Sequence, residues 1–230
     1  MWAKHNMVVF FDKFRDVSMK FILLILLVLQ PLFASAEENG LLIDDFENGL
    51  RPEWKEKVFE GRTEYRVARE GTGHVLRAES HGAASGLILE KEIDLEEFPI
   101  LSWRWKVENI MPKGDARRKE GDDYAARVYI VFPHWFFPKT RSINYIWANK
   151  LPQGEIVPNP FTSNAMMVAV ESGEEKVGEW VTETRNVRAD YRAIFGEEPP
   201  RAGAVAIMTD TDNTGGSAVA WYDDIEFKGN

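Results

Sequence analysis

The sequence predicts an all-β fold, namely a two-sheet antiparallel β-sandwich of jelly-roll type with one short helix. After residue 37 almost every ordered-looking segment alternates with a period near two, which is typical of strands and not of helices. The segments are short, rich in β-branched and aromatic residues, and separated by Gly, Pro, Asn or Asp. About ten such strands in one open sheet would leave a face uncovered, so two packed sheets are favoured.

The expected strands follow one another along the chain. After an opening strand in LLIDDFENGL (41–50), they are TEYRV (63–67), HVLRA (74–78), GLILEKEI (86–93), LSWRWKV (101–107), AARVYIVF (125–132), AMMVAV (165–170), WVTETRNV (180–187), AVAIM (204–208) and AVAWYDDIEF (218–227). One segment, ADYRAIFG (189–196), has a helical pattern, and the prolines after Gly196 cannot continue it. Residues 108–123 and 133–163 have the weakest pattern, and loops of that length are often functional.

The N-terminal segment predicts export. Lys20 precedes the apolar run FILLILLVL (21–29), and QPLFASA then supplies the small residues of a cleavage site. Because the run is shorter than the roughly 20 apolar residues that span a bilayer, a cleaved signal peptide is favoured over a membrane anchor. We expect residues 1–36 to be the signal peptide, with Met19 as an alternative start, and residues 37–230 to form a single periplasmic or extracellular domain.

Charge and cysteine content restrict the partners. The chain has no cysteine, so neither a disulfide framework nor a lipid-modified cysteine is expected. Without residues 1–36 the chain has 24 basic and 35 acidic residues, a net charge of −11. This charge argues against nucleic acid or anionic lipid as the main partner and favours neutral ligands, cations or cationic proteins. No transmembrane span is expected after residue 36.

Several motifs together resemble known families. LLIDDFENGL with Trp54, LSWRWKV, GEWVTETRNV and AWYDDIEF follow the layout of carbohydrate-binding-module-type, or galactose-binding-like, jelly rolls. SWRWKV, GDDYAARVYIVF, NYIWA, RNVRADYRAIFG and AIMTDTDNTGG together resemble the bacterial exported family catalogued as domain of unknown function 3047, over essentially the whole chain after residue 36. The layout implies first and last strands that lie side by side. It suggests glycan binding by analogy, and the family resemblance implies no activity.

The segment DTDNTGG (210–216) has three possible interpretations: a metal loop, a ligand site or a turn between strands. An EF-hand is excluded because position 12, counted from Asp210, falls on Trp221 where a glutamate is required. A loop between strands, in which Asp and Asn side chains bond their own backbone, is the simplest interpretation. A ligand site at the rim of the sandwich, with Asp210, Asp212 and Asn213, remains the alternative.

A second acidic group is a candidate metal site. Asp45 and Glu47 follow the first strand and Asp224 lies in the last, so neighbouring first and last strands would bring their carboxylates towards one hard cation. Similar jelly rolls often carry a structural calcium in that region. The alternative is that acidic residues at strand ends are solvated turn formers. No cofactor is required, and calcium here would stabilise the fold without taking part in catalysis.

Alternation separates two faces in the central strands. Trp103 and Trp105 share one face of their strand, and Arg127 and Tyr129 lie opposite the core residues of theirs. Tryptophan rings stack on sugars and arginine donates to hydroxyls, so these four are candidate contacts of a saccharide on a concave face. Core packing is the alternative for the two tryptophans.

Polar and aromatic residues flank the Arg127 strand. A charge inside a β-run needs compensation, so Asp122 or Asp123 is the expected partner of Arg127, and both are candidate ligand contacts. Beyond the strand, in FPHWFFP (132–138), the aromatic residues 135–137 lie between two prolines. They can form a lid, an exposed partner-binding or membrane-touching patch or, as we favour, an extra hairpin packed on the body.

Asn144 and Trp147 complete the candidate ligand contacts. The common catalytic motifs are absent: the sequence has no nucleophile elbow, HExxH motif, phosphate-binding glycine loop or cysteine nucleophile. We therefore expect an exported non-catalytic protein that binds a saccharide or envelope glycan on a sandwich face. The alternatives are an envelope structural or protein-interaction module, and a glycan hydrolase or lyase that uses paired carboxylates from the two aspartate loops.

Overall fold

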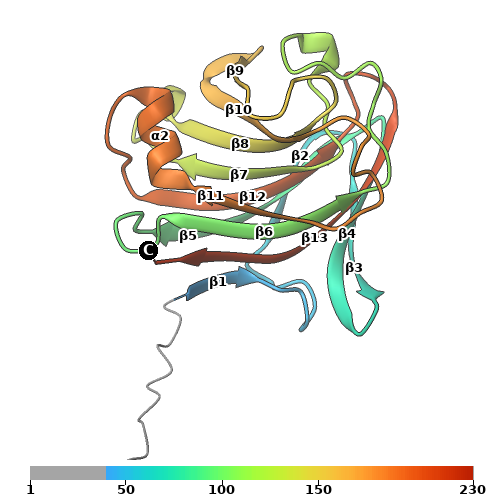
Figure 1. Cartoon of the computed structure of the whole chain (residues 1–230), viewed down its shortest axis with the longest axis horizontal. Coiled ribbons are helices and arrows are strands. Elements are labelled where there is room, and N and C mark those ends of the chain that lie inside the picture. Colours follow the sequence, from blue (N-terminus) through green and yellow to red (C-terminus); the bar gives the residue numbers. More distant parts are fainter. Residues whose placement is uncertain (1–39, 230) are drawn as a thin grey trace, which may run out of the picture. The chain divides into compact units, whose positions relative to one another are not determined.

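The computed structural model describes residues 40–229, and the expected signal peptide therefore lies outside the described residues. The chain divides into two units, Met1–Glu37 and Glu38–Asn230, and all described residues belong to the second. Its strands form two packed sheets, as the sequence predicts (Figure 1).

The first sheet has six strands. Its order is β11 (Val181–Asn186), β6 (Ile100–Val107), β13 (Ser217–Lys228), β4 (Gly73–His81) and β3 (Glu64–Glu70), and β1 (Gly40–Asp44) also pairs with β13. The β1–β13 pair is antiparallel and sets Leu41 opposite Phe227. The first and last strands thus lie side by side, as the jelly-roll layout implies.

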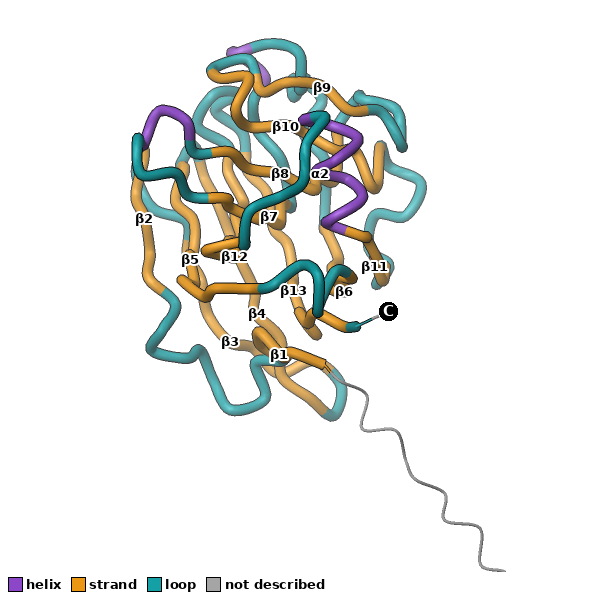
Figure 2. The backbone as a smooth tube through the Cα atoms, turned by 90° about the vertical axis from the view of Figure 1, so that its left-hand side faces the viewer, coloured by secondary structure: helices purple, strands orange, loops and turns teal. Residues whose placement is uncertain are grey.

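The second sheet has seven strands. Its order is β2 (Lys55–Glu60), β5 (Ala84–Ile93), β12 (Ala202–Asp210), β7 (Arg127–Phe132), β8 (Arg141–Ala148), β10 (Thr162–Ser172) and β9 (Ile156–Asn159). Within the described chain every strand pair is antiparallel except β8 with β10, which is parallel. Figure 2 shows the strands of this sheet from the side.

The core between the sheets is aromatic. Trp103 and Trp105 of β6 face Tyr145 and Trp147 of β8, with ring centroids 5.3 Å apart for Trp103 and Tyr145 and 5.9 Å for Trp105 and Trp147. All four side chains are fully buried. Because large rings dominate the energy of burial, this contact between the two sheets stabilises the sandwich without any disulfide.

One helix, α2 (Val187–Phe195), closes one side of the core. Asn186 caps its start by accepting a hydrogen bond from the Ala189 amide at 2.9 Å, and Gly196 ends it in the left-handed conformation. Tyr191 packs on Phe132 with ring centroids 4.6 Å apart. The prediction of a single short helix is confirmed for the described residues.

Three strands escaped the sequence prediction. β8 and β9 lie in residues 133–163, where little order was expected, and β2 was not recognised at all. β2 is exposed along its whole length, so its sequence KEKVFE shows no buried face. β2 is a strand because it pairs with β5. Such pairing depends on tertiary structure and cannot be predicted from the local sequence pattern. The additional hairpin expected after Phe132 is not present, because β8 pairs with β7 inside the main sheet. Short 3₁₀ turns occur at Lys119–Gly121 and Phe137–Lys139.

Candidate functional site

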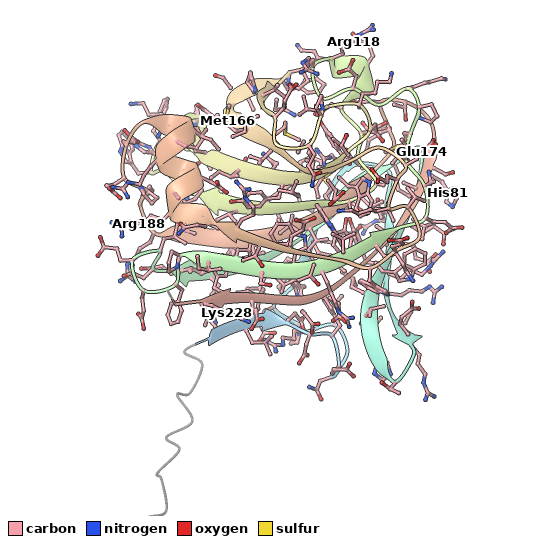
Figure 3. All side chains as sticks on the ribbon, viewed as in Figure 1. His81, Arg118, Met166, Glu174, Arg188 and Lys228 are labelled. Atoms are coloured by element: carbon pink, nitrogen blue, oxygen red, sulfur yellow. The ribbon has the colours of Figure 1, made fainter. Side chains whose placement is uncertain are left out.

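The outer face of the seven-stranded sheet has a covered half. Alternate residues of β8 and β10 point away from the main core and pack under residues of the preceding and following loops; this second apolar cluster is Ala116, Tyr124, Ile146, Ala148, Leu151, Met167 and Ala169. The covering segment turns its charged side chains to solvent, as Arg118 shows in Figure 3. The long loops that the sequence marked as candidate functional segments therefore cover one half of the outer face of this sheet.

The other half is open and forms a groove of about 700 Å³. Its floor crosses β5 and β12, where Gly86, Ala204 and Ala206 are small. Larger side chains stand on either side, with Ile88 from β5 and Tyr129 from β7. Small residues between larger ones hollow the sheet surface into a trough of the size that ligand sites have.

Polar groups surround the apolar floor. Lys57 and Glu90 line the β2 side, and Arg141, Ser142 and Asn164 line the opposite side. Arg141 donates to the Tyr191 hydroxyl at 2.8 Å and to Glu197 at 2.5 Å, so its position is fixed. The groove thus combines an apolar surface with hydrogen-bonding groups at its margins.

An aromatic loop between β7 and β8 stands at one end of the groove. Trp135 is 92% exposed and Phe136 is 48% exposed. The loop is ordered by hydrogen bonds: the Phe136 amide donates to His134 Nδ1 at 3.0 Å, and the Asn164 amide group donates to the Pro138 carbonyl at 2.6 Å. The prediction of a packed hairpin is therefore wrong, and the loop has the exposed aromatic residues of the patch alternative.

A close backbone contact fixes this loop against β12. A Cβ atom on Gly203 would lie 2.6 Å from Cγ of Pro133. Because the proline ring cannot rotate away, only glycine allows this approach. Gly203 therefore determines how near the loop stands to the groove.

A buried ion pair lies beside the groove, in contact with the lining residues Tyr129 and Met208. Arg127 and Asp210 contact each other, and both are nearly inaccessible to solvent. Asp210 also accepts from the Tyr124 amide at 3.3 Å. The guanidinium lies over the rings of Tyr124 and Tyr129, at 4.8 and 5.4 Å from their centroids. The expected partners were Asp122 or Asp123, but the structure pairs Arg127 with Asp210 because β12 lies next to β7.

Arg127 has incomplete hydrogen bonding. Its Nη2 donates to the thioether of Met208 at 3.3 Å, and the Tyr129 hydroxyl donates to the same sulfur at 3.2 Å. Its Nε is buried and has no hydrogen-bond partner among the described residues. Burial lowers the pKa of Arg127, but the carboxylates of Asp210 and Asp122 raise it overall, so the side chain is a cation.

The two aspartate loops meet beside this pair. Asp123, Asp210 and Asp212 place carboxylate oxygens within 4.8 Å of one another. Asp123 accepts from the amides of Asn213 and Thr214, at 3.2 and 2.6 Å, and thereby ties the DTDNTGG loop to the covering segment. The segment is a connection between β12 and β13, as the simplest interpretation predicts.

The remaining polar candidates serve the packing in this structure. Asp122 accepts from the Tyr124 hydroxyl at 3.0 Å and from Asn159 at 2.7 Å. Asn144 is buried and donates to Ser142 at 3.2 Å and to the Met166 carbonyl at 3.3 Å. Tyr129 is the predicted contact that lines the groove.

The tryptophan prediction needs correction. Trp103, Trp105 and Trp147 are fully buried, and their ring faces contact other core aromatics. A ring covered on this side cannot stack on a sugar, so these three belong to the core, which was the alternative for Trp103 and Trp105. The inner face of β6 is the apolar one because the partner sheet covers it.

The predicted metal ligands also do not assemble. Although β1 and β13 are neighbours, Asp45, Glu47 and Asp224 form no group of converging carboxylates in the described part of the chain. Asp224 lies 2.8 Å from Arg104, and Glu47 accepts from the His74 amide at 3.0 Å. The carboxylates of Asp224 and Glu47 therefore each have a protein donor as partner in this structure.

Sequence reasoning missed most of the groove. Gly86, Ala204, Ala206 and Met208 carry no chemistry that marks a site. The available signal was their alternation with core residues in β5 and β12, which put small residues on one outer face. The sequence did not predict which strands lie next to each other. It therefore could not predict that these residues form one trough.

The fold and this groove define a β-sandwich with a ligand-sized trough on one open face. The chain belongs to the family described as "Protein of unknown function (DUF3047)", which matches residues 52–226. No curated protein matches the sequence significantly. The described helices include none that is long and apolar enough to cross a membrane.

Solved structures with a similar fold include carbohydrate-binding modules. The family 11 module of cellulase Lic26A-Cel5E of Clostridium thermocellum is 12% identical, with 84% of this chain and 95% of that chain covered and a TM-score of 0.46. The family 30 module of cellulase Cel9D-Cel44B of the same organism is 10% identical, with 83% and 98% covered and a TM-score of 0.49. The K1 cleaved adhesin domain of Lys-gingipain from Porphyromonas gingivalis W83 is 17% identical, with 84% and 99% covered and a TM-score of 0.43.

Proposed function

We propose that this is an exported, non-catalytic protein that binds a saccharide in the groove of the seven-stranded sheet. The observation that carries the proposal is the groove itself, a trough of about 700 Å³ with an apolar floor and polar margins on an otherwise packed sandwich. Sugars present apolar C–H faces and peripheral hydroxyls, so they match a surface of this kind. Export rests on the N-terminal sequence, and a periplasmic or extracellular glycan is the ligand expected for that location.

Aromatic side chains provide stacking surfaces at the groove. Tyr129 lines it from β7 and Phe59, 57% exposed, lines it from β2. Trp135 stands on the loop whose neighbours Pro133 and His134 also line the groove. Exposed rings with a fixed backbone cost little conformational entropy on binding, which favours recognition of flat ligands.

The paired-carboxylate alternative has weaker support. A glycosidase needs two carboxyl groups about 5–10 Å apart that flank an accessible sugar. Asp123 and Asp210 are buried, and backbone amides and Arg127 occupy their oxygens. Carboxylates that are engaged in this way support a role in joining the two loops better than a role as a catalytic pair.

A glycan panel tests the proposal. The purified protein is titrated by calorimetry with neutral and acidic oligosaccharides, and the expected result is saturable binding to one structural class, with a matching rise of the melting temperature. Ala204→Phe, which fills the groove floor, should abolish binding. Ala68→Phe on the outer face of β3 is the matched control and should bind normally. Equal binding by both variants would show that the ligand lies elsewhere.

A protein-interaction role is the second candidate. The observation that favours it is the exposed pair Trp135 and Phe136, because such a patch on an ordered loop is typical of partner surfaces. If no saccharide binds, capture experiments with envelope extracts should retain a defined partner with the unchanged protein and lose it with Trp135→Ala.

A further inference from the structure

We propose that the inner end of the groove is a hydrogen-bond donor site for hydroxyl groups of an uncharged sugar, which replace the thioether of Met208 as the acceptor for Arg127 and Tyr129. The inference deepens the proposed function and rests on it, since it specifies the class of saccharide and the residues that select it. It follows from three features of this end of the groove.

The first feature is an excess of donors over good acceptors. Arg127 Nη2 donates to the carboxylate of Asp210 and also to the sulfur of Met208 at 3.3 Å, and Tyr129 Oη donates to the same sulfur at 3.2 Å. Arg127 Nε has no hydrogen-bond partner among the described residues. A thioether is a weak acceptor. A buried donor without a strong acceptor costs free energy, so an oxygen that reaches these groups gains more than it would at an ordinary surface.

The second feature is that the group to be displaced is a methionine. Met208 lines the groove and stands between it and Arg127. An unbranched side chain with three rotatable bonds can change rotamer at low cost. Tyr129 and the backbone of β12 need not move, so the donors remain in place for the incoming oxygen.

The third feature is the local charge. Arg127 is the cation of a cluster in which Asp122, Asp123, Asp210 and Asp212 lie close together, beside the groove and not in its lining. Asp210 already pairs with Arg127. An additional carboxylate would meet an excess of negative charge, whereas a hydroxyl accepts a hydrogen bond without adding charge. The site therefore favours neutral sugars over uronates.

The test compares matched probes. The full-length protein is titrated with hexaoses of glucose, mannose, galactose, xylose and N-acetylglucosamine, and with the C6-oxidised, carboxylate forms of the three hexose oligomers. A neutral oligosaccharide should bind at least about tenfold more tightly than its oxidised form. Tyr129→Phe and Arg127→Lys, each with a melting curve as fold control, should weaken that binding by about three- to tenfold. Met208→Ala should strengthen it, because no side chain then competes.

The outcomes separate the two proposals. Neutral binding that is insensitive to Tyr129→Phe and Arg127→Lys, or tighter binding of the oxidised form, would overturn the donor site while leaving the groove as a glycan site. Weaker binding by Met208→Ala would also contradict it, because the thioether would then be part of the bound state. If none of the probes binds, the proposed function fails, and the donor-site inference fails with it.

Discussion

The two outer faces of the sandwich carry similar residue types in different arrangements. On the six-stranded sheet, Trp221 lies between Arg77 and Lys106, whose charges are 5.8 and 4.4 Å from its ring centroid. Trp180 contacts Lys106 and Arg104 in the same way, at 5.2 and 4.8 Å. Aromatic and basic residues thus form a continuous row across β4, β13 and β6.

That row is neutralised by its own neighbours. Arg77 pairs with Glu79 at 2.5 Å, Lys106 pairs with Glu70 at 2.5 Å, and Arg104 contacts the carboxylates of β13. The side chains of Arg77 and Lys106 are only 16% and 15% exposed, and each has its own carboxylate partner. Most charges on this face are therefore paired within it, and Arg104 Nε lies 2.8 Å from the Asp224 carboxylate without a hydrogen bond.

The seven-stranded face is the reverse case. Its groove is mostly apolar, and beside it lies an arginine that pairs with Asp210 and donates to a thioether, while its Nε has no hydrogen-bond partner among the described residues. The comparison indicates that a ligand-sized hollow beside buried donors marks a candidate site better than the number of exposed aromatic and charged residues does.

The largest expected effect is a difference in the free energy of unfolding between substitutions on the two faces. Arg127→Met leaves the buried Asp210 without a partner and should lower the free energy of unfolding by about 3–5 kcal/mol. Lys106→Met on the other face should lower it by less than about 1 kcal/mol, because water screens that pair. Urea denaturation measures the free energy of unfolding of both variants. Equal losses of stability would show that the ion pairs on the two faces contribute alike.

A pH effect is expected where the two sheets meet at an edge. Burial raises the pKa of Glu183 on β11 to about 7, and Glu171 on β10 adds to the rise. The folded state then holds this proton while the unfolded state loses it, so stability falls as pH rises from about 4.5 to about 7.

Glu183→Gln tests this effect. The variant should be more stable than the unchanged protein at pH 8, on the order of 2 kcal/mol, and should lose that advantage at pH 4. Thermal melting across this range measures it, with Thr182→Gln on the exposed side of the same strand as control. A constant difference at all pH values would contradict the assignment.

The glycine contact beside the groove gives a smaller effect. Gly203→Ala must push Pro133 away and should cost about 1–2 kcal/mol together with a loss of ligand affinity. Gly154→Ala, whose Cβ would meet nothing within 4 Å but whose φ is positive, reports the backbone cost alone. Affinity that is unchanged in Gly203→Ala would show that the aromatic loop does not shape the groove.

The exposed tryptophan should matter for binding and not for folding. Trp135→Ala is expected to change the free energy of unfolding by less than about 0.5 kcal/mol, since the side chain is almost fully exposed. Saccharide affinity should fall by about five- to tenfold if the ring stacks on the ligand. Trp221→Phe on the opposite face should leave affinity unchanged, and a loss there would move the site to the six-stranded sheet.

The smallest effect concerns calcium. We expect a chelator to leave the melting temperature unchanged, because protein donors already contact the carboxylates of Asp123 and Asp210. Stabilisation by calcium that disappears in Asp212→Asn would instead establish a cation at that cluster.

Most of the architecture could be predicted from the sequence, although β2, β8 and β9 were missed. Alternation in segments such as LSWRWKV and AARVYIVF predicted the strand faces, and Gly196 with the prolines after it predicted the end of the helix. The sequence also indicated the two aspartate loops as a candidate site, and carboxylates from both loops do lie close together. These are local properties, because periodicity, caps and turn residues act over a few positions.

The choice of the candidate face required the arrangement of the strands in three dimensions. Trp103 and Trp105 share one face of their strand, as the residues of a stacking platform would. The opposite sheet buries both side chains, so they belong to the core. Gly86, Ala204 and Ala206 are unremarkable in sequence and become a groove because β5 and β12 are neighbours. Whether a side chain is covered depends on distant chain segments, and no local pattern encodes that contact.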